Sequence, residues 1–321
     1  MQISQDTSFF VTGHKGLVGS AIYKLLKDNG FKNIFVQSKE DLDLTKFDLV
    51  HDFFKKNKPD IVINAAAKVG GIFANSTNPV EFLLNNTIIQ NNILTASYQF
   101  HVKRLIFLGS SCIYPSNIKR AILENDFLSS KLEETNQAYA IAKIHGIQAC
   151  KSFNIQYGTK YIALMPPNIY GPNDNYDPNT SHVLPAIIKK VYDVIKKGGD
   201  TIELWGSGKP RREFLHSYDL ADAVIFIALM KDDILCNFIK QTDYPLINVG
   251  SNEDLTIQEL AEMVIQCYGK KLQIRFDKTK PDGVFRKLLD SSRINNLGWK
   301  SKISLESGIK MTIDNFHNEV T

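Results

Sequence analysis

The sequence feature that most constrains the fold is a glycine-rich turn close to the N-terminus. The apolar residues 9–11 run directly into Thr12-Gly13-His14-Lys15-Gly16-Leu17-Val18-Gly19, and apolar residues then recur at helical spacing. A strand, a glycine turn and a helix in this order can bind a dinucleotide, because glycines let the backbone approach the pyrophosphate and the helix N-terminus attracts it. An ordinary glycine turn is the alternative, and the regular spacing of three glycines argues against it.

The end of the second predicted strand indicates which dinucleotide binds. Residues 33–36 lead into Gln37-Ser38-Lys39, whereas a site that prefers NAD places Asp or Glu about here to bind the ribose 2′-hydroxyl. Ser38 and Lys39, together with Lys15 of the glycine turn, would attract a 2′-phosphate, and we expect no carboxylate to repel it. The sequence therefore predicts NADP(H); the alternative is that both lysines are simply exposed.

Predicted strands and helices continue to alternate through the first half of the chain. A helix at 47–54, a strand at 61–63, a long helix at 79–100 and a strand at 104–108 follow one another. This alternation predicts an α/β fold with a doubly wound parallel sheet. Ligands of such sheets bind outside the carboxyl ends of the strands, the edge at which Gly13, Ala65 and Ser110 would lie.

A phenol and an ammonium group lie four residues apart in Tyr139-Ala-Ile-Ala-Lys143. On a helix these two positions share one face, and a nearby cation lowers the pKa of a tyrosine from about 10 toward neutrality. A tyrosine tuned in this way can exchange a proton with an alcohol or carbonyl oxygen. The pattern is also common on solvated helix faces. It therefore indicates a catalytic pair only in combination with the glycine turn and the serine that follows the fourth strand.

Composition and charge limit the classes of protein to which the chain can belong. The chain has 321 residues, of which 43% are hydrophobic and 22% charged, and a formal net charge of +4. No dense basic run suggests a nucleic-acid partner, and no apolar run approaches the ~18 residues that span a bilayer. The four cysteines are scattered without a CxxC pair, so neither a metal site nor a disulfide framework is predicted. With no signal peptide visible, we expect a cytoplasmic protein.

Together these motifs resemble the extended short-chain dehydrogenase/reductase family, and within it the GDP-L-fucose synthases (GDP-4-keto-6-deoxy-D-mannose 3,5-epimerase-4-reductases). The resemblance rests on the glycine turn, on YxxxK 29 residues after Ser110, and on motifs spread over nearly the whole chain. These motifs are residues 65–71, 109–115, 168–172, 181–185, 212–216, 248–251, 280–283 and 286–290. Three places depart from the family pattern: Pro167, Val284-Phe285 and Lys209.

The resemblance implies a set of catalytic residues. Tyr139 would protonate the C4 oxygen during reduction, Lys143 would depress its pKa and bind the nicotinamide ribose, and Ser110, rather than Ser111, would hold the carbonyl. A 4-keto sugar has acidic C–H bonds on both flanking carbons, and Cys112 and His182 suit their inversion because thiol and imidazole titrate nearest neutrality. Cys112 as a small buried side chain and His182 as a polar first-turn residue are the alternatives.

The resemblance also implies the binding residues. The coenzyme would contact Gly13, Lys15, Gly16, Leu17, Val18, Gly19, Ser38, Lys39, Ala65, Ala66, Leu108, Gly109, Lys143, Pro166, Asn168, Ile169 and His182. The GDP-linked keto sugar would contact Asn168, Val183, Lys190, Trp205, Arg212, Asp282 and Lys287. A homodimer formed by the helices that contain residues 79–100 and 139–157 is implied as well.

A change in composition after Pro172 predicts the domain boundary. Residues 173–180 are polar and rich in turn formers, and cations near Trp205 suit a nucleoside diphosphate. We expect an NADP-binding domain of residues 1–172 with about 213–250, and a smaller α/β sugar-nucleotide domain of 173–212 and 251–321. Residues 254–264 are predicted to form a capped amphipathic helix of that domain.

Two other functions stay open from the sequence. The first is a reductase of the same architecture that reduces a GDP-4-keto-heptose at C4 without epimerisation, which Pro167 and Phe285 keep under consideration. The second is a non-catalytic protein that senses NADP(H), since a fold alone never fixes a function. Such a protein would not need the Tyr139/Lys143 pair.

Overall fold

Short apolar strands separated by helices build one parallel sheet of six strands in the order β2-β1-β3-β4-β5-β9. The computed structural model describes residues 3–177, 180–280 and 282–320. The strands of this sheet are β1 (Phe9–Thr12), β2 (Ile34–Phe35), β3 (Ile61–Asn64), β4 (Arg104–Leu108), β5 (Tyr161–Met165) and β9 (Leu246–Asn248). All the pairings are parallel, and the order of the strands reverses around β1. The predicted doubly wound sheet is confirmed.

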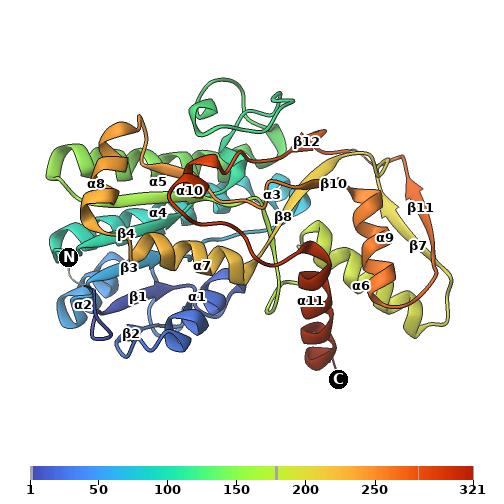
Figure 1. Cartoon of the computed structure of the whole chain (residues 1–321), viewed down its shortest axis with the longest axis horizontal. Helices are drawn as coiled ribbons and strands as arrows, with labels where there is room; N and C mark the ends of the chain where they lie inside the picture. Colours follow the sequence, from blue (N-terminus) through green and yellow to red (C-terminus); the bar gives the residue numbers. More distant parts are fainter. Residues whose placement is uncertain (1–2, 178–179, 281, 321) are drawn as a thin grey trace.

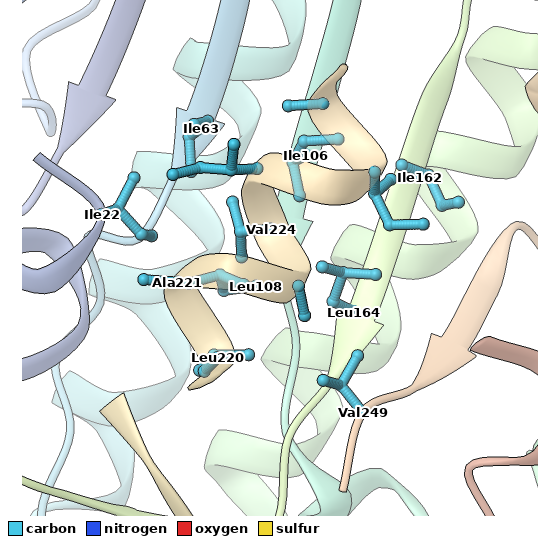
Figure 2. Packing of buried hydrophobic residues seen from close by; sticks show 14 of the residues in the cluster. Ile22, Ile63, Ile106, Leu108, Ile162, Leu164, Leu220, Ala221, Val224 and Val249 are labelled. Atoms are coloured by element: carbon cyan, nitrogen blue, oxygen red, sulfur yellow. The ribbon is translucent and has the colours of Figure 1, made fainter. Parts of the chain in front are cut away.

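Helices cover both faces of this sheet, because successive side chains of a strand point to opposite faces. Phe9 and Val11 of β1 belong to one core, with helices α1 (Leu17–Asp28), α7 (Ser217–Ala228) and α8 (Asp232–Gln241). Phe10 belongs to the other core, with helices α2 (Phe47–Asn57), α4 (Pro79–Gln99) and α5 (Gln137–Tyr157). Figure 2 shows Val224 of α7 lying over Ile106 and Leu108 of β4.

A second, smaller part of the chain carries the remaining strands and the C-terminal helix (Figure 1). One of its sheets has the order β10-β8-β12, with β6 also paired to β8, and the other pairs β7 with β11. The strands are β6 (Asn168–Tyr170), β7 (Thr201–Trp205), β8 (Arg211–His216), β10 (Asp254–Thr256), β11 (Gln273–Asp277) and β12 (Arg286–Lys287). A third apolar core joins helices α6 (Val183–Lys196), α9 (Ile257–Cys267) and α11 (Leu305–Val320).

The short elements complete the fold and correct one expectation. They are helices α3 (Ile72–Thr77) and α10 (Ser292–Asn296) and the 3-10 helices η1 (Ser111–Ile113), η2 (Glu124–Asp126) and η3 (Glu134–Asn136). The helix predicted to start at Asp254 begins only at Ile257, because residues 254–256 pair with β8. Thr256 then caps the helix through a reciprocal pair of hydrogen bonds with Glu259. Among the described helices, none is both long and apolar enough to cross a membrane.

Candidate active site

The glycine turn is held in a shape that other residues could not adopt. Gly13 has φ of +69°, and Gly16 donates a backbone hydrogen bond of 3.0 Å to its carbonyl oxygen. A Cβ atom on Gly19 would lie 2.1 Å from that same oxygen. Thr12 fixes the base of the turn, since its hydroxyl donates to Asn64 and accepts from the Ala66 amide, both at 2.9 Å. The turn therefore forms an open backbone cradle at the N-terminus of α1.

The other predicted coenzyme residues lie at the same carboxyl edge of the sheet. A Cβ on Gly13 would lie 3.0–3.1 Å from Ala65 and Ala66, so these small residues follow β3 directly beside the turn. After β4, the amide of Gly109 donates to Leu164, and the amide of Ser111 donates 3.1 Å to the carbonyl of Pro166. The ends of β1, β3, β4 and β5 thus bring together most of the residues that the sequence assigned to the coenzyme.

The site expected for the 2′-phosphate contains carboxylates that the sequence analysis did not foresee. The Lys15 ammonium lies 3.9 Å from Glu40, and the Ser38 hydroxyl donates a 2.7 Å hydrogen bond to Asp41. The expectation that no carboxylate lies near this end of β2 is therefore wrong. Glu40 and Asp41 are exposed, and they reach Lys15 and Ser38 because residues 38–42 form a turn rather than a straight continuation of the strand.

Tyr139 and Lys143 share one face of α5, as predicted, with the Lys143 nitrogen 5.7 Å from the centre of the Tyr139 ring. That nitrogen is buried and donates a 2.7 Å hydrogen bond to the carbonyl of Leu108 at the end of β4. Burial lowers the pKa of Lys143 to about 8. Burial, helped by the nearby Cys112, raises the pKa of Tyr139, and a hydrogen bond with Ser110 only partly opposes this.

These directions correct the expectation that Lys143 brings the pKa of Tyr139 toward neutrality. The cause is desolvation, which disfavours the charged form of each residue. The hydroxyl oxygen of Ser110 caps η1 by accepting from the Cys112 amide at 3.2 Å, and the same side chain forms the hydrogen bond with Tyr139. The side chains of Ser110, Cys112 and Tyr139 therefore converge.

Cys112 is half-buried and contacts a cation from the smaller part of the chain. The ammonium of Lys287, on β12, lies 3.7 Å from the Cys112 sulfur. Arg212 lies on the adjacent strand β8, where it pairs with Lys287 in the parallel register. Burial lowers the pKa of Arg212, and the nearby carboxylates of Asp282 and Glu133 partly oppose this. Cys112, Lys287 and Arg212 therefore lie together where the two parts of the chain meet.

His182 and Val183 stand at the start of α6. His182 is the N-cap residue of α6, and it is exposed to solvent. The protein atoms around its imidazole nevertheless lower the pKa by partial desolvation. The preceding segment is tied to the loop after β3, since the Gly71 amide donates 3.1 Å to the carbonyl of Thr180. His182 at the start of α6 and Cys112 on η1 lie in separate segments of the site. Within the described ranges no hydrogen bond joins them.

The residues predicted for the GDP-linked sugar lie on α6, on strands β6, β7, β8 and β12, and in the loop before β12. Lys190 donates 2.8 Å to the carbonyl of Glu203, and Trp205 keeps 62% of its surface exposed. Asp282 accepts hydrogen bonds of 2.8 and 2.6 Å from the amide and hydroxyl of Ser207. Asn168 on β6 donates 2.9 Å to the carbonyl of Glu213, and Ile169 follows it.

Some residues near the site escaped the sequence analysis. The Lys280 ammonium lies 5.4 Å from the centre of the Trp205 ring. The carboxylate of Glu133 raises the pKa of Arg212. Glu133 also caps η3, with hydrogen bonds from the amides of Thr135 and Asn136. A carboxylate just before a helical stretch is a recognisable capping signal, whereas nothing in the sequence indicates that Lys280 faces Trp205.

The sheet order, the cradle of glycines and the helices on both faces define a dinucleotide-binding protein with a Rossmann fold. The chain belongs to the NAD dependent epimerase/dehydratase family, which it matches over residues 9–238. This confirms the resemblance to the extended short-chain dehydrogenases/reductases.

Individual relatives cover nearly the whole chain. GDP-L-fucose synthase 1 of Arabidopsis thaliana is 45% identical over 97% of this chain and 93% of its own. The structure of a GDP-6-OMe-4-keto-L-xylo-heptose reductase from C. jejuni superposes with a TM-score of 0.89 and 33% identity, covering 99% of this chain and 100% of that one. A GDP-L-fucose synthetase from Naegleria fowleri bound to NADP gives 0.86 and 27%, covering 100% and 97%.

Proposed function

We propose that this chain is an NADPH-dependent enzyme that inverts C3 and C5 of a GDP-linked 4-keto-6-deoxy sugar and then reduces its C4 ketone, as in the synthesis of GDP-L-fucose. One observation carries the proposal: the Lys287 ammonium lies 3.7 Å from the Cys112 sulfur. A cation that can bind a nucleotide sugar thus contacts a thiol that lies beside Ser110, Tyr139 and Lys143. Similarity to GDP-L-fucose synthase 1 over 97% of the chain supports the same reaction.

The coenzyme fits the backbone cradle at Gly13, Gly16 and Gly19, where any side chain on Gly19 would collide with the Gly13 carbonyl. Lys15, Ser38 and Lys39 would hold the 2′-phosphate, and Lys143 the nicotinamide ribose. The assignment of NADP(H) is supported by the related structure bound to NADP. NADPH supplies the hydride for C4 when bound. The remaining contacts would come from Leu17, Val18, Ala65, Ala66, Leu108, Gly109, Pro166, Asn168, Ile169 and His182.

Tyr139 gives its phenolic proton to the C4 oxygen in this proposal. Burial raises its pKa, so the phenol is fully protonated near neutrality and ready to donate. The Lys143 ammonium then compensates the negative charge that the Tyr139 oxygen acquires, and the Leu108 carbonyl fixes its position. Ser110 positions the ketone through its hydroxyl group, which is already turned toward the start of η1.

Cys112 and His182 exchange the protons at C3 and C5. Removing a proton from one face of the sugar and returning one to the other face requires two groups on opposite sides, and these residues come from different segments of the site. Nearby protein lowers the pKa of His182, which favours the neutral imidazole that can accept a proton. The Lys287 ammonium would compensate negative charge on the Cys112 sulfur.

The GDP group binds along the smaller part of the chain. Arg212, Lys190 and Lys287 supply positive charge for the diphosphate, and the exposed Trp205 offers a ring for stacking. Asp282, which accepts two hydrogen bonds from Ser207, would accept further hydrogen bonds from the sugar or the base. Asn168 and Val183 complete the contacts that we propose for the sugar.

The direct experiment incubates the protein with GDP-4-keto-6-deoxymannose and NADPH and follows NADPH oxidation. We expect turnover and a GDP-6-deoxy-L-sugar as product. Absence of NADPH oxidation, with coenzyme binding intact, would refute this substrate. The variant Tyr139→Phe separates an enzyme from a protein that only senses NADP(H), because a sensor would show the same behaviour with either residue.

A second candidate is a C4 reductase of a GDP-4-keto-heptose that does not epimerise its substrate. Phe285, which is 69% exposed beside β12, and Pro167 occupy positions where the chain departs from the GDP-L-fucose synthase pattern. Similarity to the heptose reductase from C. jejuni supports it. Solvent deuterium incorporated at C3 and C5 identifies the epimerase; a reductase alone incorporates none.

The proposal includes two domains and a homodimer. From the change in composition after Pro172 we propose an NADP-binding domain of residues 1–172 with about 213–250, and a sugar-nucleotide domain of 173–212 and 251–321; β6 and β8, at the boundary, pair with strands of the smaller part in Figure 1. The dimer would form through α4 and α5, which expose Val80, Leu84, Ile88, Ile141 and Ile155. Light scattering after size exclusion tests it, with twice the monomer mass expected. Four free cysteines support a cytoplasmic location.

A further inference from the structure

A completely buried carboxyl group lies behind the proposed sugar-nucleotide site. Glu213 is on β8, next to Arg212, and none of its surface is exposed. One carboxyl oxygen accepts a 2.8 Å hydrogen bond from the Leu289 amide, and the other accepts from the Asn252 amide at 2.9 Å and from the Ser251 hydroxyl at 3.4 Å. One side chain therefore joins three segments of the chain: β8, the loop after β9 and the segment after β12.

The backbone around this carboxyl group is shaped to receive it. A Cβ atom on Gly250 would lie 2.2 Å from the nearer oxygen of Glu213, so only glycine leaves room at that position. The groups of Leu289, Asn252 and Ser251 that donate to Glu213 are uncharged. Burial raises the pKa of Glu213 to about 7, and these hydrogen bonds only partly oppose the increase. Burying a carboxyl group in this way costs free energy, which an apolar residue at the same position would not.

The contacts of Glu213 lie next to residues assigned to the substrate. Leu289 is two residues beyond Lys287, whose ammonium contacts Cys112. On the other side of Lys287, Arg286 pairs with Asp254, so β12 is anchored both before and after the lysine. The carbonyl oxygen of Glu213 itself accepts the Asn168 side-chain amide at 2.9 Å.

We propose that Glu213 is a positioning residue that anchors the segment carrying Lys287 for binding the sugar nucleotide. The inference rests on the proposed function, since it concerns the same site. Glu213 does not touch the substrate: its effect passes through the Leu289 amide to β12. Its loss should weaken binding of the nucleotide more than binding of the coenzyme, whose cradle lies on β1 and α1.

Glu213→Gln is the sharpest test because it preserves the size of the side chain. The new amide nitrogen would replace one of the two accepting oxygens, leaving either Leu289 or Asn252 facing a second donor. Glu253→Gln is the matched control, being an exposed carboxylate two residues from Ser251. Calorimetry with GDP and fluorescence titration with NADPH measure the two ligands separately, and hydrogen exchange of residues 286–290 reports on the anchor.

We expect Glu213→Gln to raise the Kd for GDP about tenfold, which corresponds to about 1.4 kcal/mol. The Kd for NADPH should change less than twofold, and exchange of the 286–290 amides should accelerate. Unchanged GDP binding would overturn the inference, and so would an equal weakening for GDP and NADPH, which indicates a general loss of structure. If Glu213→Gln does not fold, Glu213→Asp, which retains the charge but is too short for both contacts, is judged by the same criteria. Failure of the wild type to bind GDP refutes the proposed substrate class itself.

Discussion

The ammonium nitrogen of Lys287 lies 3.7 Å from the sulfur of Cys112, although 175 positions separate the two residues in sequence. Cys112 belongs to η1, directly after β4 of the large sheet, and Lys287 belongs to β12, beside β8. The contact therefore joins the two parts of the chain at the proposed reacting centre. Binding of a nucleotide sugar by Lys287 and proton exchange by Cys112 are expected to influence each other.

Replacing Cys112 should separate epimerisation from reduction. We expect Cys112→Ser to slow solvent deuterium incorporation at C3 and C5 by about 10²–10⁴-fold, the usual contribution of a general acid or base. Reduction of a ketone that is already epimerised should stay within a few-fold of wild type. Cys236→Ser, on helix α8, is the control. Equal losses in both assays would show that Cys112 serves binding or structure instead.

The pH dependence of reduction should have an alkaline limb that belongs to Lys143. Burial lowers the pKa of this ammonium from its ordinary value of 10.5 to about 8, so its charge is present below pH 8 and is lost as the pH rises further. Tyr139 cannot cause that limb, because burial moves its pKa in the opposite direction. We expect kcat/KM to fall with an apparent pKa near 8 in pH-rate measurements on the free enzyme.

The variant Lys143→Arg tests this assignment, since a guanidinium group keeps its charge throughout the measured range. Its activity should be lower, yet the alkaline limb should move to higher pH or disappear. Lys151→Arg, on the same helix, is the control and should retain the wild-type profile. An alkaline limb that persists unchanged in Lys143→Arg would assign it to another group.

Structure that depends on local pattern could be predicted from the sequence. A glycine turn, apolar strands and helical spacing are properties of neighbouring residues, and they place Gly13, Ser110, Tyr139 and Lys143 correctly in the fold. Contacts between distant segments were less predictable. The strand β12 has only two residues, so no pattern marks it, and its position depends on pairing with β8. The pKa directions of Tyr139 and Lys143 follow from burial, which spacing along a helix does not report.

The glycines of the turn should differ in what their replacement by alanine damages. A Cβ on Gly19 would lie 2.1 Å from a backbone oxygen, whereas one on Gly16 would meet the same oxygen at an ordinary 3.5 Å. We expect Gly19→Ala to lower the free energy of unfolding by about 1–3 kcal/mol, measured by denaturant titration. Gly16→Ala should leave stability nearly unchanged and weaken NADPH binding, because its methyl group would face the pyrophosphate. The reverse pattern would contradict the proposed cradle.

Glu40 should limit the preference for NADPH over NADH. Its carboxylate lies 3.9 Å from the Lys15 ammonium, so it competes with the 2′-phosphate for that cation and repels the phosphate charge. We therefore expect Glu40→Gln to lower the Kd for NADPH a few-fold and to leave the Kd for NADH unchanged, as measured by fluorescence titration at low salt. Both charges are exposed, so added salt should reduce the difference. Glu306→Gln, on the C-terminal helix, should alter neither Kd. If NADPH and NADH respond equally to Glu40→Gln, Glu40 does not face the 2′-phosphate, and the choice of coenzyme depends on Ser38 and Lys39 alone.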